Sequence, residues 1–96
     1  VFDMQVAVIK HLNKQDFPGY YLVEGVHWSG LHSWTAAGNA VVFTRANFIK
    51  AGLSTAEIDR IIINVHQYLD SNFSGTQSTC QANINSTGIN SKIEFE

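Results

Sequence analysis

The sequence is poor in positive charge. Its 96 residues include only six Lys and Arg against eight Asp and Glu, a formal net charge of -2. Proteins that bind nucleic acid through its phosphates gather Lys and Arg into a patch or stripe, and here they are scattered. The composition therefore argues against a nucleic-acid partner.

Long apolar runs are also missing. No stretch approaches the ~18 residues of a membrane-spanning helix, so no membrane partner is expected. The opening VFDMQVAVIK begins without Met and lacks the basic start and cleavage site of a secretory leader. The end, SKIEFE, has neither a helix cap nor a polar tail. We therefore expect further sequence beyond both ends.

Cysteine occurs once, as Cys80, within the polar stretch SGTQSTCQANINSTG. A lone cysteine is either a buried free thiol or one whose partner lies elsewhere, and polar neighbours make burial the poorer explanation. Two N-glycosylation acceptor triplets, at 72–74 and 85–87, flank it. They would be used only in a secreted protein.

The first third of the chain reads as a helix followed by a strand. In residues 2–14 the apolar side chains of Phe2, Val6 and Ile9 fall on one helical face. DFPGYY then favours a turn, and the β-branched and aromatic residues 20–25 predict a short buried strand.

The middle of the chain is less regular. Residues 26–39 have no period and contain two Gly, two Trp and two His, which predicts a loop. In residues 40–52, AVVF suggests a strand turn, while TRANFIKAG suggests a short helix with Gly52 just past its end.

Residues 54–69 fit two structures. Ser54 and Glu57 form a capping-box pattern before helically spaced apolar residues. The run of three isoleucines from Ile61 equally fits a buried parallel strand, and periodicity does not separate these cases. From Thr87 onward the tail fits either a helix or an edge strand.

A strand over 61–66 would make the order alternate between helices and strands, which is typical of parallel α/β units. Functional residues in such folds gather where strands end. That interpretation places Trp28, Trp34, His66 and Tyr68 at one edge of the sheet.

Three blocks of the sequence resemble fungal-type endoglucanases of glycoside hydrolase family 5. VHQYLDSNFSGTQSTC resembles the sixth-strand segment, with His-x-Tyr-Leu-Asp-Ser, then Ser-Gly-Thr and Cys. YYLVEGVHWSGLHSWT resembles the fifth strand and its loop, and DMQVAVIKHLNKQ the helix before it. The blocks follow the family's order, while residues 39–58 match poorly.

The resemblance implies a fragment of a (β/α)8 TIM barrel, a fold of ~250 residues. Residues 1–96 would then be a partial catalytic domain, incomplete at both ends, covering about the fifth and sixth βα units. The family's retaining mechanism uses two glutamates about 5 Å apart, from the fourth and seventh strands. Neither motif occurs here, and Glu24, Glu57, Glu94 and Glu96 lack a nucleophile-like context. The 96 residues alone are therefore expected to be inactive.

Residues His66 and Tyr68 match the family's sixth-strand cleft pair. Residues two apart on a strand point to the same side. The resemblance implies that Tyr68 hydrogen-bonds the nucleophile or the region of the sugar ring oxygen, and that His66 holds the charged network and a sugar hydroxyl. The alternative makes both the polar end of a packed segment.

Two tryptophans, Trp28 and Trp34, match aromatic positions of the fifth-strand loop, where flat rings would stack on sugars. Packing beneath the loop is the alternative. His32 stands where related sequences often carry a third aromatic residue. Glu24 in the Val-Glu-Gly pattern is expected to play a structural role, bonding loop amides or a neighbouring strand end.

Cofactors and metals are not expected. His27 and His32 lack a helix that would bring both rings to one face, and no cysteine or carboxylate lies at ligand spacing from His27, His32 or His66. Cys80 matches a family cysteine that, in many members, pairs with one after the seventh strand.

The sequence thus predicts part of an extracellular endo-β-1,4-glucanase that acts on cellulose or related β-glucans. Two rivals stay open. One is a non-catalytic carbohydrate-binding or structural small domain derived from such an enzyme, and the other is a small metal-binding or interaction domain, which rests only on the histidines.

Overall fold

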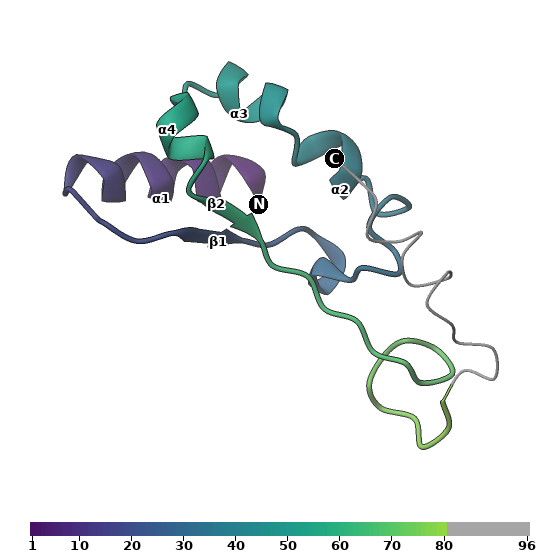
Figure 1. Ribbon diagram of the computed structural model, residues 1–96. Coiled ribbons are helices and arrows are strands. Elements are labelled where there is room, and N and C mark those ends of the chain that lie inside the picture. The colour runs from purple at the N-terminus through teal and green to yellow at the C-terminus, as the bar shows by residue number, and fades with distance from the viewer. Residues whose placement is uncertain (81–96) are drawn as a thin grey trace.

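The computed structural model describes residues 1–80 (Figure 1). Expectations for the tail from Thr87, for the triplet at 85–87, and for Glu94 and Glu96 lie outside the described residues. The described elements, in chain order, are α1 (Phe2–Lys14), β1 (Tyr21–Val23), the 3-10 turn η1 (His27–Ser29), α2 (Asn39–Val42), α3 (Arg45–Lys50), α4 (Thr55–Ile58) and β2 (Ile61–Ile63).

Helix α1 matches its predicted bounds. Val6 and Ile9 on its apolar face are 5% and 2% exposed and belong to the core. Full burial of such a side chain contributes about 1.5–3 kcal/mol. The amphipathic pattern therefore both predicts the helix and determines which face of it packs against the strands.

The two patterns within 54–69 are both used, one after the other. The Ser54 hydroxyl accepts the Glu57 N–H at 3.1 Å, and the Ser54 N–H donates to the Glu57 carboxylate at 3.1 Å, which completes the capping box of α4. The helix ends after one turn at Ile58, and β2 begins at Ile61. Beyond the capped turn of α4, the β propensity of the three isoleucines outweighs the helical spacing of the apolar residues, and the chain continues as a strand.

The prediction of a strand turn at AVVF is wrong, because these residues lie in and just after helix α2. The predicted short helix over TRANFIKAG is confirmed as α3, whose first turn is capped by the Thr44 hydroxyl accepting the Asn47 N–H at 3.2 Å. Gly52 lies past its end at φ +99°, a left-handed conformation that glycine adopts without steric cost.

Strands β1 and β2 are parallel, with Tyr21, Leu22 and Val23 opposite Ile61, Ile62 and Ile63. One face of the pair meets the helices, and there Tyr21 and Val23 are 5% and 2% exposed. On the other face Leu22 and Ile62 are 63% and 47% exposed. The described chain is thus a mixed helix and strand structure with helices packed on one side of a two-stranded parallel sheet.

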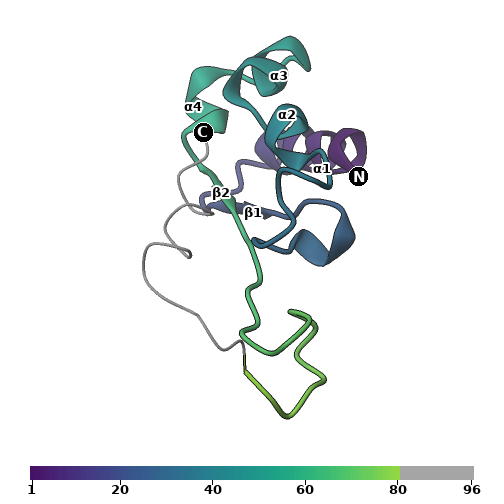
Figure 2. The same cartoon turned by 90° about the vertical axis from the view of Figure 1, so that its right-hand side faces the viewer.

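The core lies between this sheet face and the helices (Figure 2). Trp34, Phe43 and Phe48 contribute aromatic rings to it, and the Trp34 and Phe43 ring centroids lie 5.8 Å apart. The remaining buried members are Val6, Ile9, Tyr21, Val23, Leu53 and Ile58.

The molecule is elongated, with extents of 48 × 22 × 20 Å. In both views the chain after β2 runs away from the helices as residues 64–80 (Figures 1 and 2). Within residues 1–80, no helix has the length and apolar character needed to cross a bilayer.

Candidate functional site

The carboxyl ends of the two strands meet at one edge of the sheet. Glu24 follows β1 and Asn64 follows β2, and the Asn64 N–H donates to the Val23 carbonyl at 2.8 Å. The Asn64 side-chain amide donates to Glu24 Oε1 at 2.6 Å. The prediction that Glu24 bonds a neighbouring strand end is therefore confirmed.

Helix α1 fixes the Glu24 backbone from the other side. The Gln5 side chain donates from Nε2 to the Glu24 carbonyl at 2.7 Å and accepts the Glu24 N–H at 2.8 Å. This pair of hydrogen bonds replaces the ladder partners that the backbone would otherwise lack at the strand end. These two hydrogen bonds therefore fix the main-chain position of Glu24, from which its carboxylate extends.

Parallel pairing resumes beyond the strands through His66. Its N–H donates to the Ser29 carbonyl at 3.0 Å, and its carbonyl accepts the Leu31 N–H at 2.8 Å. The Ser29 side chain, 0% exposed, donates to the Asn64 carbonyl at 2.5 Å and accepts the Gly25 N–H at 3.0 Å. The backbone at His66 is therefore fixed to the loop that follows β1.

That loop is held from below by Asn39, which is 1% exposed. Its amide accepts the Val26 N–H at 2.9 Å and donates to the Val26 carbonyl at 3.1 Å. A Cβ at Gly25 would lie 2.5 Å from the Asn39 amide, closer than such contacts allow. Glycine at position 25 is thus required by close packing.

The tip of the loop is strained. His27, Trp28 and Ser29 have φ of 53°, 55° and 53°, in the left-handed region that costs L-residues energy. Such conformations persist where surrounding contacts enforce them, and they concentrate at functional sites. The strained turn leaves the Trp28 side chain 89% exposed.

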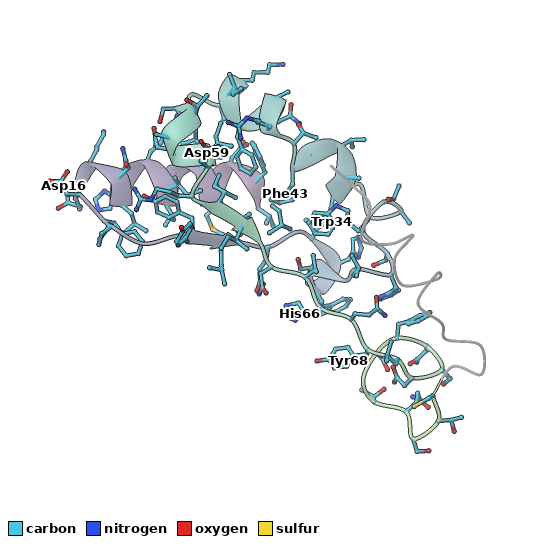
Figure 3. All side chains as sticks on the ribbon, viewed as in Figure 1. Asp16, Trp34, Phe43, Asp59, His66 and Tyr68 are labelled. Carbon is cyan, nitrogen blue, oxygen red and sulfur yellow. The ribbon has the colours of Figure 1, made fainter. Side chains whose placement is uncertain are left out.

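An open hollow of about 470 Å³ lies at this edge of the sheet. In Figure 3 the side chains of His66 and Tyr68 project to the same side of the segment that follows β2. His66 Nε2 lies 3.6 Å from Glu24 Oε1, an ion pair whenever the imidazole is protonated. The lining residues are Glu24, His27, Trp28, Gly30, His32, His66, Tyr68, Phe73 and Ser74.

Three of the four site residues expected from the sequence line this hollow: Trp28, His66 and Tyr68. The fourth, Trp34, is 2% exposed and packs in the core beside Phe43. Its side chain offers no face to a sugar ring, because the ring is needed to fill the space beneath the loop.

Phe73 and Ser74 add a wall to the hollow that the sequence does not predict, and the loop that carries them is held by Asp70. The Asp70 carboxylate, in a residue 7% exposed, accepts the N–H groups of Gly75 at 3.0 Å and Gln77 at 2.9 Å. The Gly75 N–H, aided by those of Gln77 and Asp70 and by the Ser74 hydroxyl, holds the pKa of Asp70 below its usual 3.8. An Asp followed within seven residues by Asn, Ser, Gly and Thr is the available signal for such a loop.

Phe73 completes the wall by stacking on His32, with ring centroids 4.7 Å apart and planes at 18°. His32 occupies the position where related sequences often carry a third aromatic residue. Its ring contacts an aromatic ring of the neighbouring loop. The sequence signal for Phe73 is only that an aromatic residue stands alone in a polar stretch.

Within residues 1–80, no group of three or more His, Cys, Asp or Glu side chains is arranged to hold a metal ion. Cys80 is exposed and forms no disulfide within that range. Its pairing with a cysteine from a segment beyond residues 1–96 stays a prediction.

Comparison with known proteins identifies fungal relatives. A probable endo-beta-1,4-glucanase B of Neosartorya fischeri is 33% identical in an alignment of 87 positions that covers 81% of this chain and 23% of that protein. Endoglucanase 3 of Humicola insolens is 32% identical over 83% of this chain and 18% of its own length. The chain is homologous to one segment of fungal endoglucanases.

A third endoglucanase, gh5-1 of Neurospora crassa, is 39% identical over 61 residues, 64% of this chain and 13% of its own length. The chain thus spans less than a quarter of the length of these endoglucanases. No family model matches it, and no solved structure does. The predicted resemblance to fungal endoglucanases is confirmed.

Proposed function

We propose that the chain is part of a secreted endo-β-1,4-glucanase, in which it forms about the fifth and sixth units of a (β/α)8 barrel. The parallel strand pair with helices on one face supports this architecture. So does the apolar face bearing Leu22 and Ile62, which is exposed here and would face inward in a closed barrel.

The chain's contribution is the cleft, while the catalytic glutamates belong to segments outside it. Retaining hydrolysis needs an acid/base and a nucleophile about 5 Å apart. The Tyr68 hydroxyl donates a hydrogen bond to the nucleophile carboxylate or near the sugar ring oxygen. His66, backed by Glu24 at 3.6 Å, holds a sugar hydroxyl and the charge around it.

Substrate binding falls to Trp28. Its ring is 89% exposed at the hollow and presents a flat apolar surface, which suits the C–H face of a β-glucan unit. One observation carries the proposal. Trp28, His66 and Tyr68 line one hollow at the carboxyl edge of parallel strands, in a chain whose relatives are named endoglucanases.

The test uses the full-length gene product assayed on a soluble cellulose derivative. Tyr68→Phe removes one hydrogen bond to a charged or developing charged group and should lower kcat about tenfold or more. Trp28→Ala removes a binding surface and should raise KM with a smaller change in kcat.

Tyr20→Phe is the matched control, since Tyr20 is exposed and precedes β1 at the end opposite to Glu24. It should leave both constants unchanged. A full-length protein that binds β-glucan without cleaving it would favour the non-catalytic carbohydrate-binding alternative. Equal, small effects of Tyr68→Phe and Tyr20→Phe would overturn the role given to Tyr68.

A further inference from the structure

The loop after Tyr68 holds Asn72 in a defined conformation. The Asn72 side chain is exposed, and its Oδ1 accepts the Ser74 hydroxyl at 2.6 Å and the Ser74 N–H at 3.3 Å. Its Nδ2 donates to no atom of residues 1–80. The amide oxygen is thus engaged by the residue two positions on, while the nitrogen faces solvent.

The residues around Asn72 hold this arrangement in place. Phe73 stacks on His32, and the Ser74 hydroxyl also lies 3.3 Å from the Asp70 carboxylate and 2.6 Å from the Thr76 hydroxyl. Phe73 and Ser74 line the hollow, whereas Asn72 does not. A large group on the Asn72 nitrogen would therefore stand in solvent beside the site, without entering it.

We propose that Asn72 carries an N-linked oligosaccharide. Asn72, Phe73 and Ser74 form the acceptor triplet, and a bulky, solubilising glycan is tolerated only on an exposed side chain. The folded loop fits an acceptor site, because Asn72 Nδ2 donates to no atom of residues 1–80 and Ser74 supplies the hydroxyl at the third position of the triplet. This inference rests on the secretion included in the proposed function.

The transfer requires a lipid-linked oligosaccharyl diphosphate as co-reactant. A bond forms between Asn72 Nδ2 and C1 of the first sugar, and the bond from C1 to the diphosphate oxygen breaks. The lipid diphosphate leaves with the bonding electron pair, and the amide nitrogen gives up one proton. No oxidation or reduction occurs.

The experiment expresses the full-length protein in yeast behind the host's own secretion leader, so that entry into the secretory pathway does not depend on native targeting. Glycans are released with a peptide N-glycosidase in heavy-oxygen water, which marks each formerly occupied Asn as labelled Asp. We expect the peptide containing Asn72 to carry the label. An unlabelled Asn72 in the secreted protein would overturn the proposal.

Two variants sharpen the result. Asn72→Gln should reduce the intact mass by one glycan, while Ser74→Thr keeps the hydroxyl and should remain glycosylated. Asn72→Gln should also keep glucanase activity within about twofold, a small barrier change, since Asn72 lies outside the hollow. If the Ser74→Thr variant also lost the glycan, the acceptor triplet would not be what directs glycosylation of Asn72.

The failure of the proposed function has separate signatures. A protein that is glycosylated behind the host leader but stays inside cells with its native sequence would refute secretion and leave the acceptor site intact. A secreted, glycosylated protein without activity on β-glucan would refute the glucanase proposal alone.

Discussion

Residues 1–63 and residues 64–80 are stabilised by different interactions. The first region buries a cluster of aliphatic and aromatic side chains between α1, the short helices and one face of the strand pair. In the second region the buried residue is Asp70, whose carboxylate binds the N–H groups of the loop around it. Apolar packing thus fixes the strand ends, and a charged, hydrogen-bonded loop extends the site from them.

The two tryptophans give the sharpest contrast within this comparison. Trp34→Ala empties a buried site in the first region and should lower the free energy of unfolding by about 3–5 kcal/mol. Trp28→Ala changes an 89% exposed side chain and should alter it by less than about 0.5 kcal/mol. Denaturant unfolding of the full-length protein measures both. Equal losses would show that the strained loop shares the stability of the core.

Acid should loosen the second region selectively. The pKa of Asp70 is lowered in the folded chain, chiefly by the Gly75 N–H, so its stabilisation is fully present above the usual value of 3.8. It is lost as pH falls through the lower folded value. Hydrogen exchange of the Gly75 and Gln77 amides should therefore stay slow down to about pH 4, beyond the intrinsic pH effect on exchange, and lose protection below it.

Asp70→Asn is the companion variant. It removes the charge that those amides bind, so they should exchange several-fold faster at neutral pH and show no protection step in acid. Amides of α1 serve as the internal control, since that helix packs in the first region. If α1 loses protection together with the loop, the two regions unfold as one.

The smallest effect is expected at the Arg45–Asp59 ion pair, 3.0 Å apart with side chains 54% and 65% exposed. Exposed pairs are screened by solvent, so Arg45→Ala should change the free energy of unfolding by less than about 1 kcal/mol. Measurements in low and high salt check this. A loss close to that of Trp34→Ala would mean that packing is not the main support of the first region.

Much of the fold follows from local sequence pattern. The amphipathic spacing in α1 and the capping box at Ser54 each predict an element that the structure contains. The strand turn expected from AVVF did not form: Val41 and Val42 are exposed, and burial of Asn39 and Phe43 at the two ends of α2 outweighs the β propensity of the valines. The change from α4 to β2 within a few residues was also beyond periodicity alone, because both patterns were present.

The site was only partly predictable. The resemblance matched His66, Tyr68 and Trp28 to a cleft, and strand alternation explained only why residues 66 and 68 would share a side. Trp34, six residues from Trp28, could not be assigned to surface or core, since burial depends on Phe43 and the helices around it. Phe73 reaches the hollow only through its stack on His32, a contact between residues 41 positions apart that no local pattern encodes.

The hydrogen bonds from Asn64 to Val23 and from His66 to Ser29 have one more consequence. Between these two hydrogen bonds one segment advances two residues, from 64 to 66, and the other advances six, from 23 to 29. Residues 24–28 therefore loop out of the ladder, and pairing resumes at Ser29. Such a loop can be replaced as a unit. Loops of other lengths could be grafted between Val23 and Ser29 while the His66 backbone keeps its partner, which would allow the rim of the hollow to be redesigned without moving the segment after β2 that carries the histidine.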